Sequence, residues 1–347
     1  MKTQVKAPVL TVGALLTLGV AAHAQLGAWS ELPSLPEPRS GHYAGTSHGA
    51  LIIAGGANFP VPLYQGGTKI WYPDVRVLPR GASQWVSTPP LPTPIGYGAS
   101  VSDEKGLICI GGGDANTHST AVFRLEWTGG ALRRSELPAL PQTFAFGAAA
   151  LLDDVLYVIG GQETPASTQA LDVLWSLDLK RKGATWKVMA PCPGGGRILP
   201  VVSAQNGALY VWSGASLAPD DAGKAVRTYL RDGWKFSPKG GWQAIAAPPS
   251  PMVAAPVANL GSSLICVLGG DDGALSSRSA ELKDNHPGFS REVWVYDVRS
   301  DAWTRSDTLP VSLVTTNAVT LGHSIIIPGG EDRPGHRNPR VLKWDAK

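Results

Sequence analysis

Short apolar runs alternate with glycine-rich and proline-rich turns along this chain of 347 residues, which contains 41 glycines and 29 prolines. Six of the runs end at a glycine pair or a close relative of one, and each has the length and apolar character of a buried strand. They are "LIIAGG" (51–56), "LICIGG" (107–112), "LYVIGG" (156–161), "LYVWSG" (209–214), "LICVLGG" (264–270) and "SIIIPGG" (324–330). Many short strands joined by tight turns predict an all-β chain.

A second pattern accompanies the first: a tryptophan, six further residues and then a proline. Its copies are Trp29 to Pro36, Trp85 to Pro92, Trp186 to Pro193, Trp242 to Pro249 and Trp303 to Pro310, and a sixth copy ends at Pro141 with Arg134 in place of the tryptophan. Each proline is followed 19 or 20 residues later by a glycine pair or its relative. Most units carry a further strand after the glycines, so one unit of about 50 residues is a four-stranded sheet.

Six four-stranded units of this length predict a six-bladed kelch-type β-propeller. The last unit stops short, because no tryptophan strand follows "PRVLKW" near the C-terminus. The segment from Gln25 to Pro36 is little more than one such strand, and the two ends together have the length of one blade. We therefore expect the N-terminal strand to complete the last blade and close the ring, which removes open sheet edges.

Residues 1–24 are typical of a secretory signal peptide. Lys2 and Lys6 precede the apolar run "APVLTVGALLTLGVAA", and "AHA" (22–24) has the small-x-small cleavage pattern. We expect cleavage after Ala24, which gives a periplasmic mature chain in which residues 25–347 form the propeller. A retained N-terminal anchor is the alternative.

Charge and cysteine content exclude several classes of function. The formal net charge of +3 falls to +1 without the two N-terminal lysines, and no basic block remains, so neither nucleic acid nor a membrane surface is an expected partner. Cys109 and Cys266 lie in apolar runs and are expected to be buried thiols. Three cysteines without close spacing, Cys192 included, favour neither a disulfide framework nor a thiolate metal site.

Neighbouring strands of a blade run in opposite directions, so every glycine-pair loop and every segment after a signature proline faces the same end of the central channel. We call this end the mouth. The polar residues expected there are Asn58, Asp114, Gln162, Asp271, Asp272 and Glu331 from the glycine-pair loops, and Arg39, His42, Arg197 and Asn317 from the other segments. A loop-lined mouth suits a ligand site, and it suits a docking surface for another protein equally well.

The densest polar cluster is "GEDRPGHR" (330–337) in the last glycine-pair loop. It is either an exposed turn or part of a site. Pro334-Gly335 is a tight-turn dipeptide that can fold Arg337 back toward Glu331. In the first loop, Asn58 can bind a ligand hydroxyl or its own backbone. Lys69 and Trp71 can offer a charge and a sugar-stacking face, or be a solvated lysine and a packed tryptophan.

Other motifs carry weaker signals. "GGDDG" (269–273) lacks the later oxygen ligands and the closing glutamate of a calcium loop. "HPGF" (286–289) belongs to a long insertion of the fifth blade, and we interpret it as a structural turn, with a cover over the mouth as the alternative. There is no nucleophile elbow, zinc spacing, phosphate-cradling loop or haem motif, so no cofactor or metal is expected.

Taken together, "GGANFP", "GGTKIWYPDV", "GGDDG…HPGF" and "GEDRPGHR" on six kelch blades resemble the cyclically permuted mutarotases, which are relatives of bacterial N-acetylneuraminate epimerase (sialic acid mutarotase). The Gly-Glu-x-x-Pro-Gly-x-Arg motif is the most specific of these features. In the non-permuted relatives the Gly-Glu blade precedes the Gly-Gly-Ala blade, whereas here it comes last, so the resemblance implies the same circular order with a moved chain break.

The resemblance implies an isomerase that interconverts the α and β anomers of N-acetylneuraminate or a related reducing sugar without a cofactor. It implies that Glu331 is the catalytic acid/base and that Arg337 binds the substrate carboxylate; Asn58, Lys69, Arg333 and His336 are weaker candidates for substrate contacts. The main alternative is a non-catalytic kelch propeller that binds a glycan or a protein. A copper enzyme similar to galactose oxidase is a second alternative, but it needs a Cys-linked Tyr and converging His ligands, and no matching set is evident.

Overall fold

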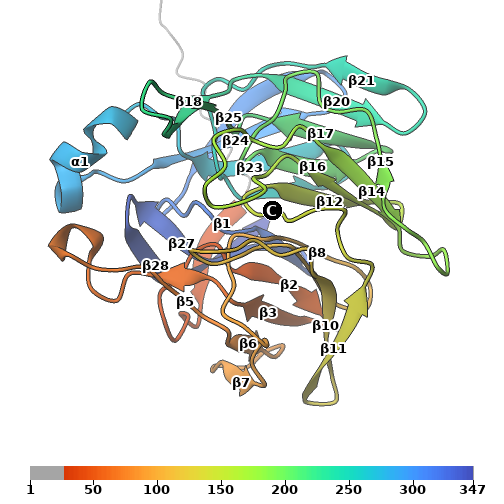
Figure 1. Ribbon diagram of the computed structural model, residues 1–347. Coiled ribbons are helices and arrows are strands. Elements are labelled where there is room, and N and C mark those ends of the chain that lie inside the picture. Colours follow the sequence, from red (N-terminus) through yellow and green to blue (C-terminus); the bar gives the residue numbers. More distant parts are fainter. Residues whose placement is uncertain (1–26, 347) are drawn as a thin grey trace, which may run out of the picture.

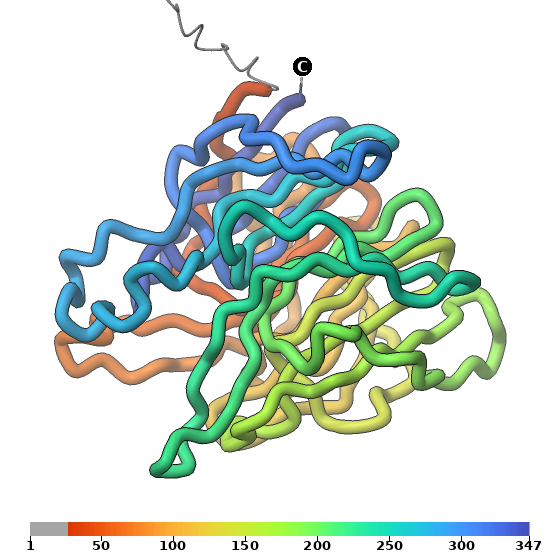
Figure 2. Tube along the Cα trace, turned by 90° about the horizontal axis from the view of Figure 1, so that it is seen from above, coloured from red at the N-terminus to blue at the C-terminus, as the bar shows by residue number. Residues whose placement is uncertain are grey.

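A computed structural model describes residues 27–346, which form six four-stranded antiparallel sheets arranged around a centre (Figure 1). Figure 2 shows the first and last described segments of the chain side by side. The predicted signal segment, 1–24, lies outside the described residues. From the channel outward, the blades are β2 (Tyr43–Ser47), β3 (Ala50–Ala54), β6 (Val75–Leu78) and β7 (Val86–Thr88); β8 (Ala99–Ser102), β9 (Leu107–Ile110), β10 (Val122–Thr128) and β11 (Ala131–Leu137); β12 (Ala148–Leu152), β13 (Val155–Ile159), β14 (Leu174–Asp178) and β15 (Lys187–Val188); β16 (Val201–Gln205), β17 (Ala208–Trp212), β20 (Gly233–Ser237) and β21 (Gly241–Ala244); β22 (Val257–Leu260), β23 (Leu264–Gly270), β24 (Ser290–Asp297) and β25 (Ala302–Thr308); and β26 (Val319–Leu321), β27 (Ser324–Arg333), β28 (His336–Ala346) and β1 (Gly27–Leu32). The predicted six-bladed propeller is confirmed.

The N-terminal strand closes the sixth blade, as the lengths of the two chain ends predicted. β1 pairs antiparallel with β28 over its whole length, from Gly27 opposite Ala346 to Leu32 opposite Val341. Trp29 lies opposite Trp344, and the two ring centroids are 6.2 Å apart. Closure therefore joins strands from the two ends of the chain.

Adjacent blades are held together by apolar packing. Six clusters of buried side chains lie one at each of the six interfaces between neighbouring blades. Neighbouring blades therefore cover both faces of the inner strands of each blade. This explains why the strands that end at the glycine pairs are almost continuously apolar.

The repeated tryptophans have a structural reason. In four of them the indole N–H donates to a backbone carbonyl of the preceding blade: Trp85 to Pro33, Trp186 to Pro138, Trp242 to Ala190 and Trp303 to Ala246, over 2.8–3.1 Å. Trp29 donates instead to Asp307 Oδ2 at 3.1 Å. Each tryptophan thus supplies packing area and one directional bond across a blade interface.

Arg134, which replaces the tryptophan in the second blade, covers an aromatic ring instead. Its guanidinium carbon lies 4.1 Å from the ring centroid of Phe123 on the neighbouring strand. The long stem and the planar head of arginine can cover apolar surface much as an indole does.

A closed ring of six backbone hydrogen bonds narrows the channel just inside the mouth. One residue per blade takes part, and each donates its N–H to the carbonyl of the next member, over 2.6–3.0 Å. In the order of donation, the members are Gly41, Thr315, Ala254, Leu199, Phe146 and Tyr97, which donates back to Gly41. All six have φ between 51° and 64°. We call this feature the throat ring; it fixes the position of each mouth segment relative to the others.

The residue before each throat-ring member pairs with the residue that follows a glycine pair. The six bridges are Ser40–Ala57, Gly96–Gly113, Ala145–Gln162, Ile198–Ala215, Val253–Asp271 and Val314–Glu331. The glycine-pair loops are therefore tied to the throat ring in six equivalent places. Only the fifth and sixth blades have a carboxylate at this position, Asp271 and Glu331.

Three excursions from the blades project on the left-hand side of Figure 1. They are the 57–71 flap with β4 (Ala57–Asn58), η1 (Leu63–Gln65) and β5 (Ile70–Trp71), the hairpin of β18 (Ala215–Pro219) and β19 (Ala225–Tyr229), and the 271–290 insertion with η2 (Ser276–Arg278), α1 (Ser279–Leu282) and η3 (Lys283–Asn285). Two of them follow glycine pairs and the β18–β19 hairpin follows the related Ser213-Gly214, so all three extend from the mouth. No helix of the described part of the chain is long and apolar enough to cross a membrane.

Candidate functional site

A cavity of about 680 Å³ lies at the mouth, beside the throat ring. Its walls come from the β18–β19 hairpin, the 271–290 insertion and the β27–β28 turn, and it reaches the throat ring at Leu199, Ala254 and Thr315. Its carboxylates are Asp271, Asp272 and Glu331. His286 and Phe289 of "HPGF" also line the cavity, so this segment forms part of the site wall.

Hydrogen bonds hold both the backbone and the side chain of Glu331. Its backbone pairs with Val314 through two hydrogen bonds of 2.9 Å. Its side-chain Oε1 accepts a hydrogen bond from the Gly335 N–H at 2.8 Å and one from Arg337 Nη1 at 3.0 Å. The side chain is 16% exposed, so the carboxylate is held rigidly and still reaches the cavity.

The turn that brings these groups together is the predicted one. Pro334 and Gly335 connect Arg333 to His336 as a two-residue turn, and Gly335 has φ 76°, which suits glycine at the second central position of a type II turn. Glu331 and Arg337 are cross-strand partners in the register of β27 and β28. The expectation that Arg337 folds back toward Glu331 is confirmed.

Arg337 is enclosed by protein groups. Its side chain is 3% exposed and does not line the cavity. Nη1 binds Glu331, Nη2 donates to the Tyr97 hydroxyl at 3.2 Å, and the guanidinium carbon lies 4.9 Å from the Phe59 ring centroid. In this arrangement Arg337 positions Glu331; the carboxylate-binding role that the resemblance implies for it stays a prediction.

Lys69 and Asn58 lie on the 57–71 flap beside this pair. The ammonium of Lys69 lies 4.9 Å from the Tyr97 ring centroid, 5.6 Å from that of Phe59 and 5.7 Å from that of Trp71. Asn58 is nearly buried and pairs with Ile70 in the flap. Tyr97 and Phe59 therefore link Lys69 to Arg337, although neither Lys69 nor Asn58 lines the cavity.

Arg333 and His336 turn toward Asp332 rather than toward Glu331. His336 Nδ1 lies 2.7 Å from Asp332 Oδ1, Arg333 Nη1 lies 3.5 Å from the same atom, and Asn338 donates to Asp332 Oδ2 at 2.8 Å. Asp332 is 8% exposed and gathers these groups around itself. The two candidates are thus brought together with Asp332, away from the cavity lining.

Two of the cations expected at the mouth are buried structural residues, and that expectation was wrong. Arg39 pairs with Glu37 and Asp74, and Arg197 pairs with Asp232; both arginines are fully buried. A guanidinium at this depth is stabilised by its carboxylate partners. Glu37 is two residues from Arg39, whereas Asp74 and Asp232 are each 35 positions from their arginines.

Tyr97 and Tyr229 are site residues that the sequence reasoning missed. Tyr97 belongs to the throat ring and contacts Arg337, and the Tyr229 hydroxyl donates to Asp271 Oδ2 at 2.6 Å inside the cavity. Burial, followed by the bond to Asp271, raises the pKa of Tyr229 well above its usual value. Aligning the six mouth segments at the throat-ring position would have singled out Tyr97, since the other members are apolar, glycine or threonine.

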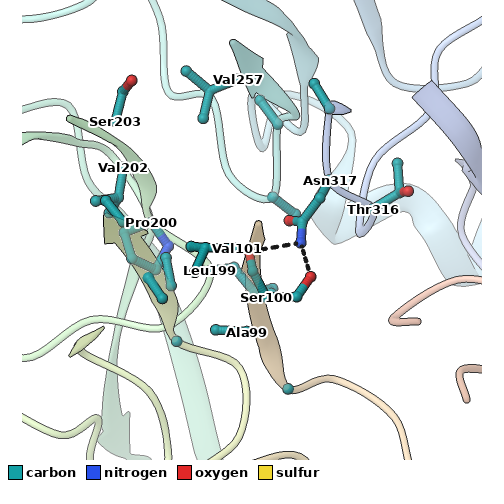
Figure 3. A pocket seen from close by; sticks show the side chains of 18 of the residues that line it. Ala99, Ser100, Val101, Leu199, Pro200, Val202, Ser203, Val257, Thr316 and Asn317 are labelled. Atoms are coloured by element: carbon teal, nitrogen blue, oxygen red, sulfur yellow. Dashed lines mark hydrogen bonds between the residues drawn. The ribbon is translucent and has the colours of Figure 1, made fainter. Parts of the chain in front are cut away.

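A second cavity of about 300 Å³ lies deeper, inside the channel (Figure 3). It is lined by the innermost strands, where Asn317 donates to Ser100 Oγ at 2.7 Å. His42 is the titratable side chain of basic character there, and burial, together with Arg39, lowers its pKa to about 3. With no carboxylate among its described lining residues, this cavity offers less acid/base chemistry than the mouth.

Within residues 27–346, no group of three His, Cys, Asp or Glu side chains is arranged to hold a metal ion. The three cysteines are buried free thiols, as expected for Cys109 and Cys266. The ionisable side chains that line the mouth cavity are three carboxylates, the Tyr229 hydroxyl, the Arg227 guanidinium and the His286 imidazole.

Known proteins resemble this chain in parts. The family model of N-acetylneuraminate epimerase matches residues 137–275, which include β12 to β23 and not the Glu331 turn. Beta-scruin of Limulus polyphemus is 26% identical over 310 residues, which cover 86% of this chain and 31% of that protein. The chain thus spans less than a third of the length of this relative.

Two N-acetylneuraminate epimerases are also similar. That of Yersinia pestis (strain Pestoides F) is 36% identical over 114 residues, covering 30% of this chain and 29% of that protein. That of Haemophilus influenzae (strain 86-028NP) is 28% identical over 235 residues, covering 60% of each. The solved structure of YjhT superimposes with a TM-score of 0.65 at 16% identity, covering 91% of this chain and 96% of that one, which supports the fold.

Proposed function

We propose that this chain, a kelch-type propeller related to the N-acetylneuraminate epimerases, is an isomerase that interconverts the α and β anomers of N-acetylneuraminate or a related reducing sugar. The observation that carries the proposal is the Glu331 carboxylate, held by Arg337 and the Gly335 N–H at the wall of a mouth cavity. The cavity volume of about 680 Å³ is within the range of small-molecule sites.

The proposed reaction needs proton transfer and no redox step. Glu331 accepts the proton of the anomeric hydroxyl while the bond between the anomeric carbon and the ring oxygen breaks. The same carboxyl group then gives this proton to the ring oxygen, so Glu331 returns to its ionised form and no other proton donor is needed. The open-chain form now has a carbonyl at the former anomeric carbon. Rotation presents the other carbonyl face, and the reverse transfers close the ring as the opposite anomer. A positioned acid/base group typically contributes about 10² to 10⁴ in rate.

The surrounding residues have supporting roles in this proposal. Arg337 keeps the Glu331 carboxylate in one orientation and, as the resemblance implies, is a candidate for the substrate carboxylate. Lys69 and Asn58 are candidates for contacts from the flap side. Arg333 and His336 support the turn through Asp332. No cofactor enters the scheme.

The experiment is direct. Crystalline β-N-acetylneuraminate is dissolved and its equilibration with the α anomer is followed by proton NMR, with and without the protein. We expect the protein to accelerate the approach to equilibrium and to leave the final anomer ratio unchanged. Equal rates in buffer and in protein solution would refute the sialic acid assignment, and several neutral reducing sugars run in parallel would identify another substrate.

A non-catalytic propeller that binds a glycan or a protein is the second candidate. The similarity to beta-scruin, a protein whose name denotes no enzyme, covers 86% of this chain and favours it. This alternative predicts sugar or protein binding without any change in the anomerisation rate.

The proposal also includes export. The signal-like segment 1–24 supports a periplasmic location, where a mutarotase would act on sugars outside the cytoplasm. Fractionation of cells that express the full chain, with N-terminal sequencing of the product, tests this; an uncleaved chain in the cytoplasm would contradict it.

A further inference from the structure

One face of β19 lines the mouth cavity. Side chains alternate along a strand, and Ala225, Arg227 and Tyr229, two residues apart, all contribute to the cavity wall. Tyr229 is fixed by its hydrogen bond to Asp271, which in turn accepts the Gly273 N–H at 3.0 Å. The hairpin is thereby tied to the 271–290 insertion, and Arg227 is presented to the space between them.

Arg227 brings a permanent positive charge to a cavity wall that is otherwise mainly acidic. Three carboxylates line the cavity, those of Asp271, Asp272 and Glu331. Its basic lining residues are Arg227 and His286, and burial lowers the pKa of His286, so that the imidazole is neutral near pH 7. Without Arg227 the cavity would present three negative charges and no permanent positive charge to an incoming anion.

Arg227 also has free hydrogen-bonding capacity. Its side chain is exposed, and no ion pair or side-chain hydrogen bond engages its guanidinium within residues 27–346. Arg337, by contrast, is buried and bound to Glu331 and Tyr97. Arg333, in the β27–β28 turn, is engaged by Asp332 and does not line the cavity. Among the described residues that line the cavity, Arg227 carries the guanidinium, and its N–H groups are available.

We propose that Arg227 is the residue that recognises the carboxylate of an anionic sugar and so determines the specificity of the mouth cavity. The planar guanidinium can form two parallel hydrogen bonds to a carboxylate, which fixes the orientation of the sugar as well as its position. Tyr229, whose proton is directed to Asp271, offers its oxygen as an acceptor for a sugar hydroxyl beside that carboxylate. This inference deepens the proposed function by assigning the substrate class, and it rests on that function only for the choice of sugar.

The test separates binding from catalysis. The probe is the α-methyl glycoside of N-acetylneuraminate, which cannot mutarotate, and its neutral methyl ester is the reference. Binding of both is measured by titration calorimetry or ligand-observed NMR with wild type, Arg227→Gln and Lys224→Gln. Lys224 is a matched control, because it is an exposed cation of the same hairpin that does not line the cavity.

We expect Arg227→Gln to weaken binding of the acid by about 10- to 100-fold, as for the loss of a charge-assisted hydrogen-bond pair. Its binding of the ester should change less than twofold, and Lys224→Gln should bind both probes as wild type does. Unchanged thermal stability of Arg227→Gln would show that the exposed substitution leaves the fold intact.

Two results would overturn the proposal: wild type that does not bind the acid, or Arg227→Gln that binds it as tightly as wild type does. Both can be told apart from failure of the proposed function. A protein that binds the acid through Arg227 but does not accelerate anomerisation is a sialic acid binder and no mutarotase. If wild type accelerates anomerisation and Arg227→Gln does so with the same KM, the protein is a mutarotase that binds the substrate carboxylate through another residue.

Discussion

Glu331 and Arg337 are six residues apart in the chain and directly opposite each other across β27 and β28, with Oε1 and Nη1 separated by 3.0 Å. The two-residue turn and the register shift between Glu331 and Arg333 together determine this distance. The pair lies at the junction of the throat ring, the flap and the mouth cavity, so its integrity affects both the stability and the proposed chemistry of the site.

Arg337→Met is expected to leave the Glu331 carboxylate without its cation and to remove the bond to Tyr97. Breaking a fully buried pair costs about 3–5 kcal/mol, and since Glu331 retains 16% exposure we expect a loss of about 2 kcal/mol in the free energy of unfolding. Denaturant titration measures it. In a Glu331→Gln background the same change should cost at most half as much; equal costs would mean that the two side chains are not energetically coupled.

Gly335→Ala is expected to disturb the turn that positions Glu331. Gly335 has φ +76°, and a Cβ there would lie 2.7–2.8 Å from side-chain atoms of Leu63 on the flap. We expect a loss of about 1–2 kcal/mol in stability together with a slower anomerisation rate.

Gly81→Ala is the matched control for Gly335→Ala. Gly81 has φ +75°, but nothing lies within 4 Å of its Cβ position. Gly81→Ala should lose only the stability that the glycine backbone conformation contributes, about 1 kcal/mol. Its anomerisation rate should equal that of wild type. If both variants keep the wild-type rate, the geometry of the turn does not control the reaction.

Trp29→Ala is expected to weaken closure of the ring. It removes the packing on Trp344 and the bond to Asp307, and because Trp29 is partly exposed we expect a loss of about 2 kcal/mol, below the range for a fully buried tryptophan. Trp29→Phe should retain part of the stability that Trp29→Ala loses. Thermal unfolding measures both; a Trp29→Ala variant with the wild-type Tm would show that β1 does not hold the sixth blade.

Burial of the neutral His42 imidazole is expected to make the folded chain less stable in mild acid. Its pKa is about 3 in the folded chain, against about 6.5 when unfolded, so the unfolded chain binds one more proton between these values. Stability must therefore fall as the pH drops through this window, by about 2 kcal/mol from pH 7 to pH 5.

The measurement is the free energy of unfolding at several pH values for wild type and His42→Asn. Between pH 4 and 6, the free energy of unfolding should depend less steeply on pH in His42→Asn than in wild type. The difference in slope should correspond to about one proton, whatever the absolute stability of the variant. His323→Asn removes an exposed imidazole and is the control. An identical slope in wild type and His42→Asn would contradict the assignment to His42.

The sequence predicted the fold well because the repeat has local physical causes. Each tryptophan and each glycine pair recurs at the same structural position, so the arithmetic of their spacing predicted six blades and the closing strand β1. The Pro334-Gly335 turn likewise depends on neighbouring residues alone. The Glu331–Arg337 pairing needs this turn and also the register shift between Glu331 and Arg333.

The rest of the site depends on contacts between distant segments, which no local pattern encodes. Tyr97 reaches Arg337 across 240 positions, and Tyr229 reaches Asp271 across 42. Arg39 and Arg197 looked like mouth cations because nothing near them in the sequence revealed Asp74 and Asp232 as partners. Arg227 lies in a hairpin without a motif, and its place at the cavity wall depends on contacts of that hairpin with the distant 271–290 insertion, such as the bond from Tyr229 to Asp271.

The most direct test of the central claim is the rate of α/β equilibration of N-acetylneuraminate, followed by proton NMR with equal concentrations of wild type and Glu331→Gln. This substitution keeps the size of the side chain and removes its capacity to exchange a proton. We predict that wild type accelerates equilibration and that Glu331→Gln loses about 10²-fold or more of the catalysed rate while still binding the sugar. A Glu331→Gln variant with the wild-type rate would contradict the assignment of Glu331 as the acid/base.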